Sequence, residues 1–163
     1  MGCPFVNIYN LSLVTINSYK IERLKKVSYE AFTEYMRSML TVGIPEFKGC
    51  LQSLNYHSEE IEVENQETHE MENKIVWYFD NDLTLDEQSI LAKIVVYKWW
   101  CSLIQETTAF QPKLNYREFK QLGTDQNLKQ KSEYKDRLRE EFNQDICAYQ
   151  LENLDKIPFF GGN

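Results

Sequence analysis

The segment TLDEQSILAKIVVYKWWCSLI, residues 84–104, decides the fold of this 163-residue chain. It opens with a capping box, in which the Thr84 hydroxyl and the Glu87 carboxylate each accept a hydrogen bond from a backbone N–H group at a helix start. The rest of the segment is apolar on almost every side of the expected helix, interrupted by Lys93 and Lys98. A helix that is apolar all round is buried, and the two lysines can extend their stems to solvent. The segment therefore predicts a buried central helix.

Amphipathic helices are expected on both sides of this segment. Ser28 is the predicted N-cap of a helix that runs to about Leu40 and ends at Gly43. Pro45 is expected to begin a second short helix. The apolar face of the first helix consists of Phe32, Tyr35, Met36, Met39 and Leu40, and that of the second consists of Phe47, Cys50, Leu51 and Leu54. Each face recurs at three- and four-residue spacing, which indicates packing on a core.

The C-terminal half predicts a short helix from Asn115 to Leu122, stopped by Gly123, and then a long helix that starts at Thr124 or Asp125. The apolar stripe of the long helix repeats at steps of four, four, four and three residues, at Tyr134, Leu138, Phe142, Ile146 and Tyr149. The opposite face is charged. The fold class is therefore mainly α, a helical bundle around a central apolar helix.

A β-hairpin is predicted at about residues 58–80. Residues 60–64 alternate with period two, residues 74–79 are β-branched and aromatic, and residues 66–72 form a polar loop. Between His57 and Asn73 there are seven glutamates and no Lys or Arg, which matches the formal net charge of −7 of the whole chain. The seven are Glu59, Glu60, Glu62, Glu64, Glu67, Glu70 and Glu72. They form either a solvated surface that aids solubility or a channel surface that repels DNA.

Extended arms are expected on both sides of a helical domain at residues 27–153. Residues 1–26 carry no charge before Lys20 and alternate roughly between apolar and polar, so they predict an extended N-terminal arm. Such an arm needs a sheet edge, either on a neighbouring subunit or on its own domain. Residues 154–163 form a C-terminal tail in which Ile157, Pro158, Phe159 and Phe160 are expected to dock in a groove of a partner or to anchor on the core of the chain itself.

The composition excludes several classes of protein. No stretch is long and apolar enough to cross a membrane, and a net charge of −7 disfavours tight binding to nucleic acid phosphates. The four cysteines show no C-x-x-C pair and are expected to be free thiols, as in a reducing cytosol. With only two histidines, His57 and His69, and no nucleophile elbow or phosphate-binding loop, we expect no enzyme, no cofactor and no metal.

The run WYFDNDLTLDEQSILA at residues 77–92, followed by the Trp99–Trp100 pair, resembles the head-to-tail connector proteins of tailed bacteriophages. The likeness extends over about residues 28–149. It implies a ring-forming neck adaptor, helical with a β-hairpin or arms, that conducts DNA passively and has no catalytic residue. The implied partners are copies of the chain, the portal protein and the next neck or tail protein. The implied location is the virion, after assembly in the host cytoplasm.

Two other functions fit the sequence. The first is a small acidic regulatory or inhibitory protein that binds one protein partner through its hairpin. The second is a metal-dependent enzyme that uses His57, His69 and nearby glutamates. Assembly into rings separates the connector from the first, and metal content separates it from the second.

Overall fold

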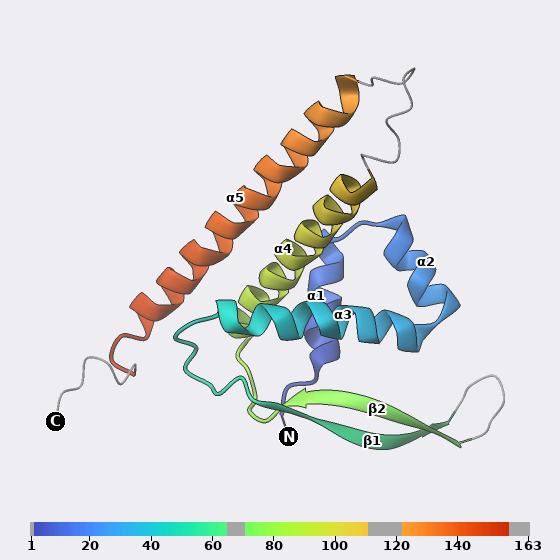
Figure 1. The fold of residues 1–163 in the computed structure, drawn as a ribbon. Coiled ribbons are helices and arrows are strands. Elements are labelled where there is room, and N and C mark those ends of the chain that lie inside the picture. Colours follow the sequence, from blue (N-terminus) through green and yellow to red (C-terminus); the bar gives the residue numbers. More distant parts are fainter. Residues whose placement is uncertain (1, 65–70, 111–121, 157–163) are drawn as a thin grey trace.

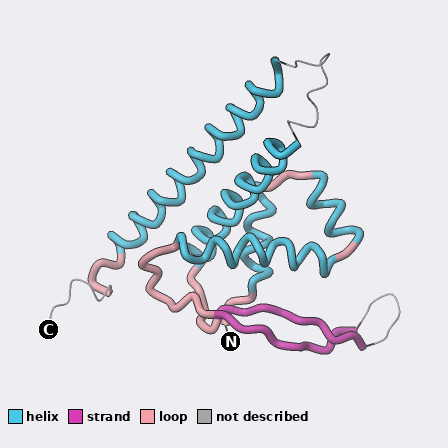
Figure 2. Tube along the Cα trace, in the orientation of Figure 1, coloured by secondary structure: helices cyan, strands magenta, loops and turns pink. Residues whose placement is uncertain are grey.

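The structure is a computed structural model that describes residues 2–64, 71–110 and 122–156 (Figure 1). Most of the described chain is helical, and the strands form one antiparallel hairpin at an edge of the molecule (Figure 2). The prediction of a mainly α chain with one β-hairpin is confirmed. In chain order the elements are α1 (Phe5–Thr15), α2 (Tyr19–Val27), α3 (Tyr29–Gly43), the 3₁₀ turn η1 (Ile44–Glu46), β1 (Tyr56–Glu64), β2 (Met71–Phe79), α4 (Leu85–Phe110) and α5 (Leu122–Glu152).

Helix α4 is the centre of the core, as the sequence predicts for its first half. Helices α1, α3 and α5 all pack against it. The buried apolar residues of this half are Ile90, Leu91, Ala92, Ile94, Val95 and Val96. The capping box is present, because the Thr84 N–H donates to Glu87 Oε2 at 2.8 Å and the Glu87 N–H donates to Thr84 Oγ1 at 3.3 Å. The prediction that the whole segment 84–104 is buried is wrong for the second half of α4, where Trp99 and Trp100 are only half-buried.

Helix α5 runs antiparallel to α4 along its length (Figure 1). The predicted stripe faces the core, since Leu138, Phe142, Ile146 and Tyr149 are buried. The helix begins at Leu122, slightly before the expected Thr124 or Asp125. The short helix expected from Asn115 lies almost wholly outside the described residues.

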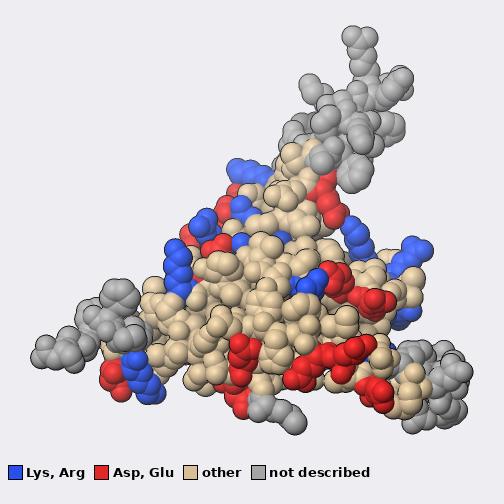
Figure 3. Space-filling model, turned by 60° about the horizontal axis from the view of Figure 1, so that its bottom comes forward, with Lys and Arg blue, Asp and Glu red and all other residues tan. Residues whose placement is uncertain are grey.

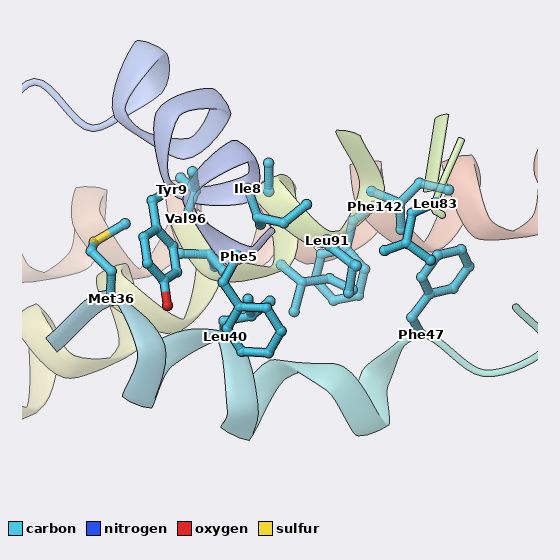
Figure 4. Close-up of a cluster of buried hydrophobic side chains, with 14 of the residues drawn as sticks. Phe5, Ile8, Tyr9, Met36, Leu40, Phe47, Leu83, Leu91, Val96 and Phe142 are labelled. Carbon is cyan, nitrogen blue, oxygen red and sulfur yellow. The ribbon is translucent and has the colours of Figure 1, made fainter. Parts of the chain in front are cut away.

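The expected extended N-terminal arm is wrong for most of its length, because residues 5–15 and 19–27 are helical. One face of α1 carries Phe5, Ile8, Tyr9 and Ser12, all buried, and this spacing is that of a helix. Because Ser12 is polar, the helical spacing of these buried residues is hard to recognise in the sequence. The Ser12 hydroxyl donates to the Ile8 carbonyl at 2.7 Å, so the burial leaves no polar group without a partner. Figure 4 shows Phe5, Ile8 and Tyr9 lying beside Leu91 and Leu40.

The first residues of the expected arm are extended, and they pair with a sheet edge of their own domain. The Phe79 N–H donates to the Cys3 carbonyl at 2.8 Å, and the Cys3 N–H donates to the Asn81 carbonyl at 3.1 Å. Pro4 forms an isolated bridge with Tyr78. Of the two alternatives, folding back on the same chain is therefore the one observed for residues 3 and 4.

The N-cap of α3 is confirmed, since Ser28 Oγ accepts a hydrogen bond from the Ala31 N–H at 3.1 Å. The second short helix expected from Pro45 is reduced to the three residues of η1. Gly49 adopts a φ of 77°, a left-handed conformation that interrupts a helix. A Cβ at this glycine would also lie 2.3 Å from the Gln150 side-chain nitrogen, so the loop packs closely on α5.

Candidate functional site

The hairpin lies at an edge of the described chain and carries the predicted acidic residues that the structure describes. All nine residues of β1 pair with β2, from Tyr56 opposite Phe79 to Glu64 opposite Met71. The base of the hairpin is anchored, because Phe79 is fully buried and its ring centroid lies 4.6 Å from that of Phe5 in α1. Toward its tip the hairpin is exposed, with Ile75 at 68% and Met71 at 61%.

Three of the seven predicted glutamates, Glu59, Glu60 and Glu62, are exposed on β1. Glu64 and Glu72 lie in the paired strands, but their side chains are outside what the structure describes, and Glu67 and Glu70 lie outside the described residues altogether. Figure 3 brings the hairpin side forward and shows acidic side chains gathered in the lower half of the view, with most Lys and Arg above. This surface repels anions and attracts cationic groups.

His57 sits at the base of the hairpin between two carboxylates. Its Nδ1 lies 2.6 Å from Asp80 Oδ1, and its Nε2 lies 3.3 Å from Glu59 Oε1. The hydrogen bond to Asp80 and then that to Glu59 raise the pKa of His57 above its ordinary value of 6.5. The imidazole is exposed, and its two hydrogen bonds connect β1 with Asp80, the residue after β2.

A groove of about 680 Å³ separates β2 from α3, and nothing in the sequence pattern signals it. Its floor is apolar and contains Phe5 and Tyr9 of α1. One wall is the outer edge of β2 from Asn73 to Trp77, and the other is α3 from Ser28 to Arg37. The Arg37 guanidinium lies 4.5 Å from the centroid of the Trp77 ring, a cation–π contact at one end of the groove.

A buried polar cluster joins α4, α5 and the loop after η1, and the sequence suggests only its Glu87 member. Glu87 is 1% exposed. The Tyr149 hydroxyl donates to Glu87 Oε1 and accepts from the Leu51 N–H at 3.1 Å. The Cys50 thiol donates to the same carboxylate oxygen at 3.6 Å, and burial followed by this negative charge raises the pKa of Cys50 to about 12. Every polar atom of the cluster has a partner, so its role is structural.

The remaining predicted site residues give no further site. His69 and the predicted docking residues Ile157, Pro158, Phe159 and Phe160 lie outside the described residues. Within the described ranges, no group of three or more His, Cys, Asp or Glu side chains is placed to hold a metal ion. The surface features of the described residues are therefore the acidic hairpin and the groove along β2.

No protein-family model, curated protein or solved structure matches this chain significantly. None of the helices in the described ranges has the length and apolar character needed to span a lipid bilayer.

Proposed function

We propose that this chain is a structural subunit of a closed oligomeric ring in the neck of a tailed bacteriophage, between the portal and the tail. The observation that carries the proposal is the hairpin, which stands at the edge of the helical body and exposes Glu59, Glu60 and Glu62. The resemblance of residues 77–92 to connector proteins supports the same role. Its partners are then copies of itself, the portal protein and the next neck or tail protein, within a virion assembled in the host cytoplasm.

The hairpin suits a passive conduit for DNA. Duplex DNA carries one negative charge per about 1.7 Å of its axis, and charges repel effectively within a Debye length of about 8 Å at physiological salt. A ring of such hairpins facing the lumen keeps phosphates from binding to the wall. DNA then passes through the ring without a specific contact.

Helix α1 supplies a second surface suited to contact between copies. None of its eleven residues is charged, and on its outward side Leu11 is 40% exposed and Val14 is 84% exposed. These two residues border a smaller groove of about 270 Å³ that reaches Tyr134 and Leu138 of α5. A contact between unlike surfaces of neighbouring copies closes into a ring when the rotation between them divides a full turn.

The test is assembly followed by electron microscopy. Light scattering should show a mass that is a fixed multiple of the 19.4 kDa chain, and negative-stain images should show annular particles. A chain that remains monomeric at every concentration, and that does not associate with the portal protein encoded in the same genome when the two are co-expressed, refutes the proposal.

The conduit role has its own test on the assembled ring. Neutralising Glu59, Glu60 and Glu62 together to Gln should increase retention of a duplex DNA fragment at low salt. The matched control neutralises Glu133, Glu140 and Glu141, three exposed glutamates on α5, and removes the same charge. Equal retention by the two variants would show that the hairpin does not line the DNA path.

The same exposed glutamates also fit the second candidate, a small acidic protein that binds one partner. That function requires a monomer whose binding to a single protein weakens steeply with salt. Failure to form rings combined with salt-sensitive capture of one host protein, lost in the hairpin triple variant and kept in the α5 control, would favour it.

A further inference from the structure

The outer edge of β2 is open along most of its length. The Phe79 N–H points away from β1, because it bonds to Cys3. Directions alternate along an antiparallel strand, so Trp77, Ile75 and Asn73 also point their N–H and C=O groups away from β1. The Pro4–Tyr78 bridge covers the Trp77 end of this edge, and within the described ranges no backbone hydrogen bond from another segment reaches Ile75 or Asn73.

This edge already accepts a strand where it is covered. Residues 3 and 4 pair with it at Tyr78 and Phe79, and beyond Pro4 the chain turns into α1. The open part, residues 73–76, forms most of one wall of the groove beside α3. An unpaired edge beside an apolar groove is a template for a further strand.

The outer edge of β1 has the matching pattern. Each β1 residue that faces Trp77, Ile75 or Asn73 across the hairpin also points its backbone groups outward; these residues are Ser58, Glu60 and Glu62. In the proposed pairing, β1 of one copy runs antiparallel to β2 of the next. The side chains of residues 58, 60 and 62 then lie on the same face of the sheet as those of residues 73, 75 and 77 of the neighbouring copy. The sheet then continues from copy to copy, with every hairpin pointing the same way, which is the arrangement that a ring requires.

The charge pattern selects this pairing over the two-fold alternative. Pairing β1 with β1 would place Glu60 and Glu62 of one copy opposite the glutamates of the other, and like charges directly opposite are destabilising. Pairing β1 with β2 places each glutamate strand between two β2 strands, which carry Ile75 and Asn73 on that face. Glutamate strands are then two strand spacings, about 9.6 Å, apart.

We infer that neighbouring copies join by pairing the outer edge of β1 with the outer edge of β2, so that the hairpins form one continuous closed sheet. This inference rests on the proposed ring. It accounts for a hairpin that, among the described residues, has the edge of β1 and the 73–76 part of the edge of β2 open, since a closed sheet leaves no edge unpaired.

The test removes one outward N–H at a time without touching the pairing inside the hairpin. Proline lacks the N–H and is tolerated where that group faces away from the ladder. Ile75→Pro and Glu60→Pro should therefore keep the hairpin but weaken assembly at least tenfold in apparent Kd. Ile75→Thr, which retains the N–H and a β-branched side chain, is the matched control and should assemble as the unmodified chain does.

Hydrogen exchange read by mass spectrometry supplies a second readout that does not depend on any substitution. Peptides covering residues 73–77 and 58–62 should exchange at least tenfold more slowly in the assembled protein than in the diluted monomer. Assembly without such protection, together with normal assembly of both proline variants, overturns the edge pairing and leaves the ring intact. A chain that never assembles overturns the ring as well. Circular dichroism verifies that each variant is folded.

Discussion

Replacing Tyr149 with Phe tests whether the buried polar cluster holds the two ends of the helical body together. The substitution keeps the ring and removes only the hydroxyl. That hydroxyl donates to Glu87, which is 1% exposed, and accepts from the Leu51 N–H at 3.1 Å. Burial, and then the bond to Glu87, raises the pKa of Tyr149, so the hydroxyl remains a donor throughout the neutral range.

The magnitude follows from the two bonds. A hydrogen bond to a charged group contributes about 1.5–3 kcal/mol, and an ordinary one contributes about 0.5–1.5 kcal/mol. Tyr149→Phe should therefore lower the free energy of unfolding by about 2–4 kcal/mol. With a urea m-value of about 2 kcal/mol/M, the unfolding midpoint falls by roughly 1–2 M.

The assay is urea unfolding followed by tryptophan fluorescence at one fixed chain concentration, so that association between copies, as proposed, contributes equally to every variant. Tyr19→Phe is the control, because Tyr19 is 78% exposed, and its midpoint should not change. A loss below about 0.5 kcal/mol for Tyr149→Phe, the level of an ordinary surface substitution, would refute the structural role of the cluster.

Three further outcomes are expected. Phe142→Ala, at a fully buried position, should cost about 3–5 kcal/mol in the same urea assay. His57 should titrate above pH 6.5 by NMR, and Asp80→Asn should lower its pKa toward that value, because the carboxylate stabilises the imidazolium. The stability that His57 contributes is then fully present below pH 6.5 and lost as pH rises through the raised pKa. With a disulfide reagent in native buffer, exposed Cys147 should react before Cys50, whose pKa is raised to about 12 by burial.

Each of these has a control within the chain. Leu151→Ala, at a position 67% exposed, should change the free energy of unfolding by less than about 0.5 kcal/mol. A change as small as this for Phe142→Ala would contradict the described core. Asp86→Asn, which is not a partner of His57, should leave its titration unchanged. Equal thiol rates in native protein would contradict the burial of Cys50, and equal rates in urea confirm that the reagent reaches both.

The sequence predicts correctly those elements whose defining residues lie close together in the chain, within one helical turn or along one apolar helix face. The Thr84 to Glu87 capping box places the start of α4 correctly because both of its bonds join residues three apart. The apolar repeat at Leu138, Phe142 and Ile146 predicts the buried face of α5 for the same reason. The hairpin is predictable because alternating residues and a polar loop suffice to pair two adjacent strands.

The sequence pattern is misleading where a polar side chain is buried and finds its hydrogen-bond partners only in the folded chain. Ser12 interrupts the apolar stripe of α1, and its burial is tolerated because its hydroxyl bonds to the Ile8 carbonyl and lies 3.4 Å from the Ala92 carbonyl of α4. Without that contact, Leu11 and Leu13 suggest an extended strand. The error in the N-terminal arm thus comes from packing against α4, 80 residues away in the chain.

The sequence by itself determines the helical class, the central place of α4, the hairpin and its acidic strand, because these follow from periodicity, capping and charge within short stretches. Long-range packing sets the helical state of residues 5–15 and 19–27, the Tyr149 contact with Glu87, and the groove that leaves part of the edge of β2 open. Each of these depends on surfaces brought together from distant parts of the chain, and the free energy that selects them comes from burial and hydrogen bonding that no short segment has when alone.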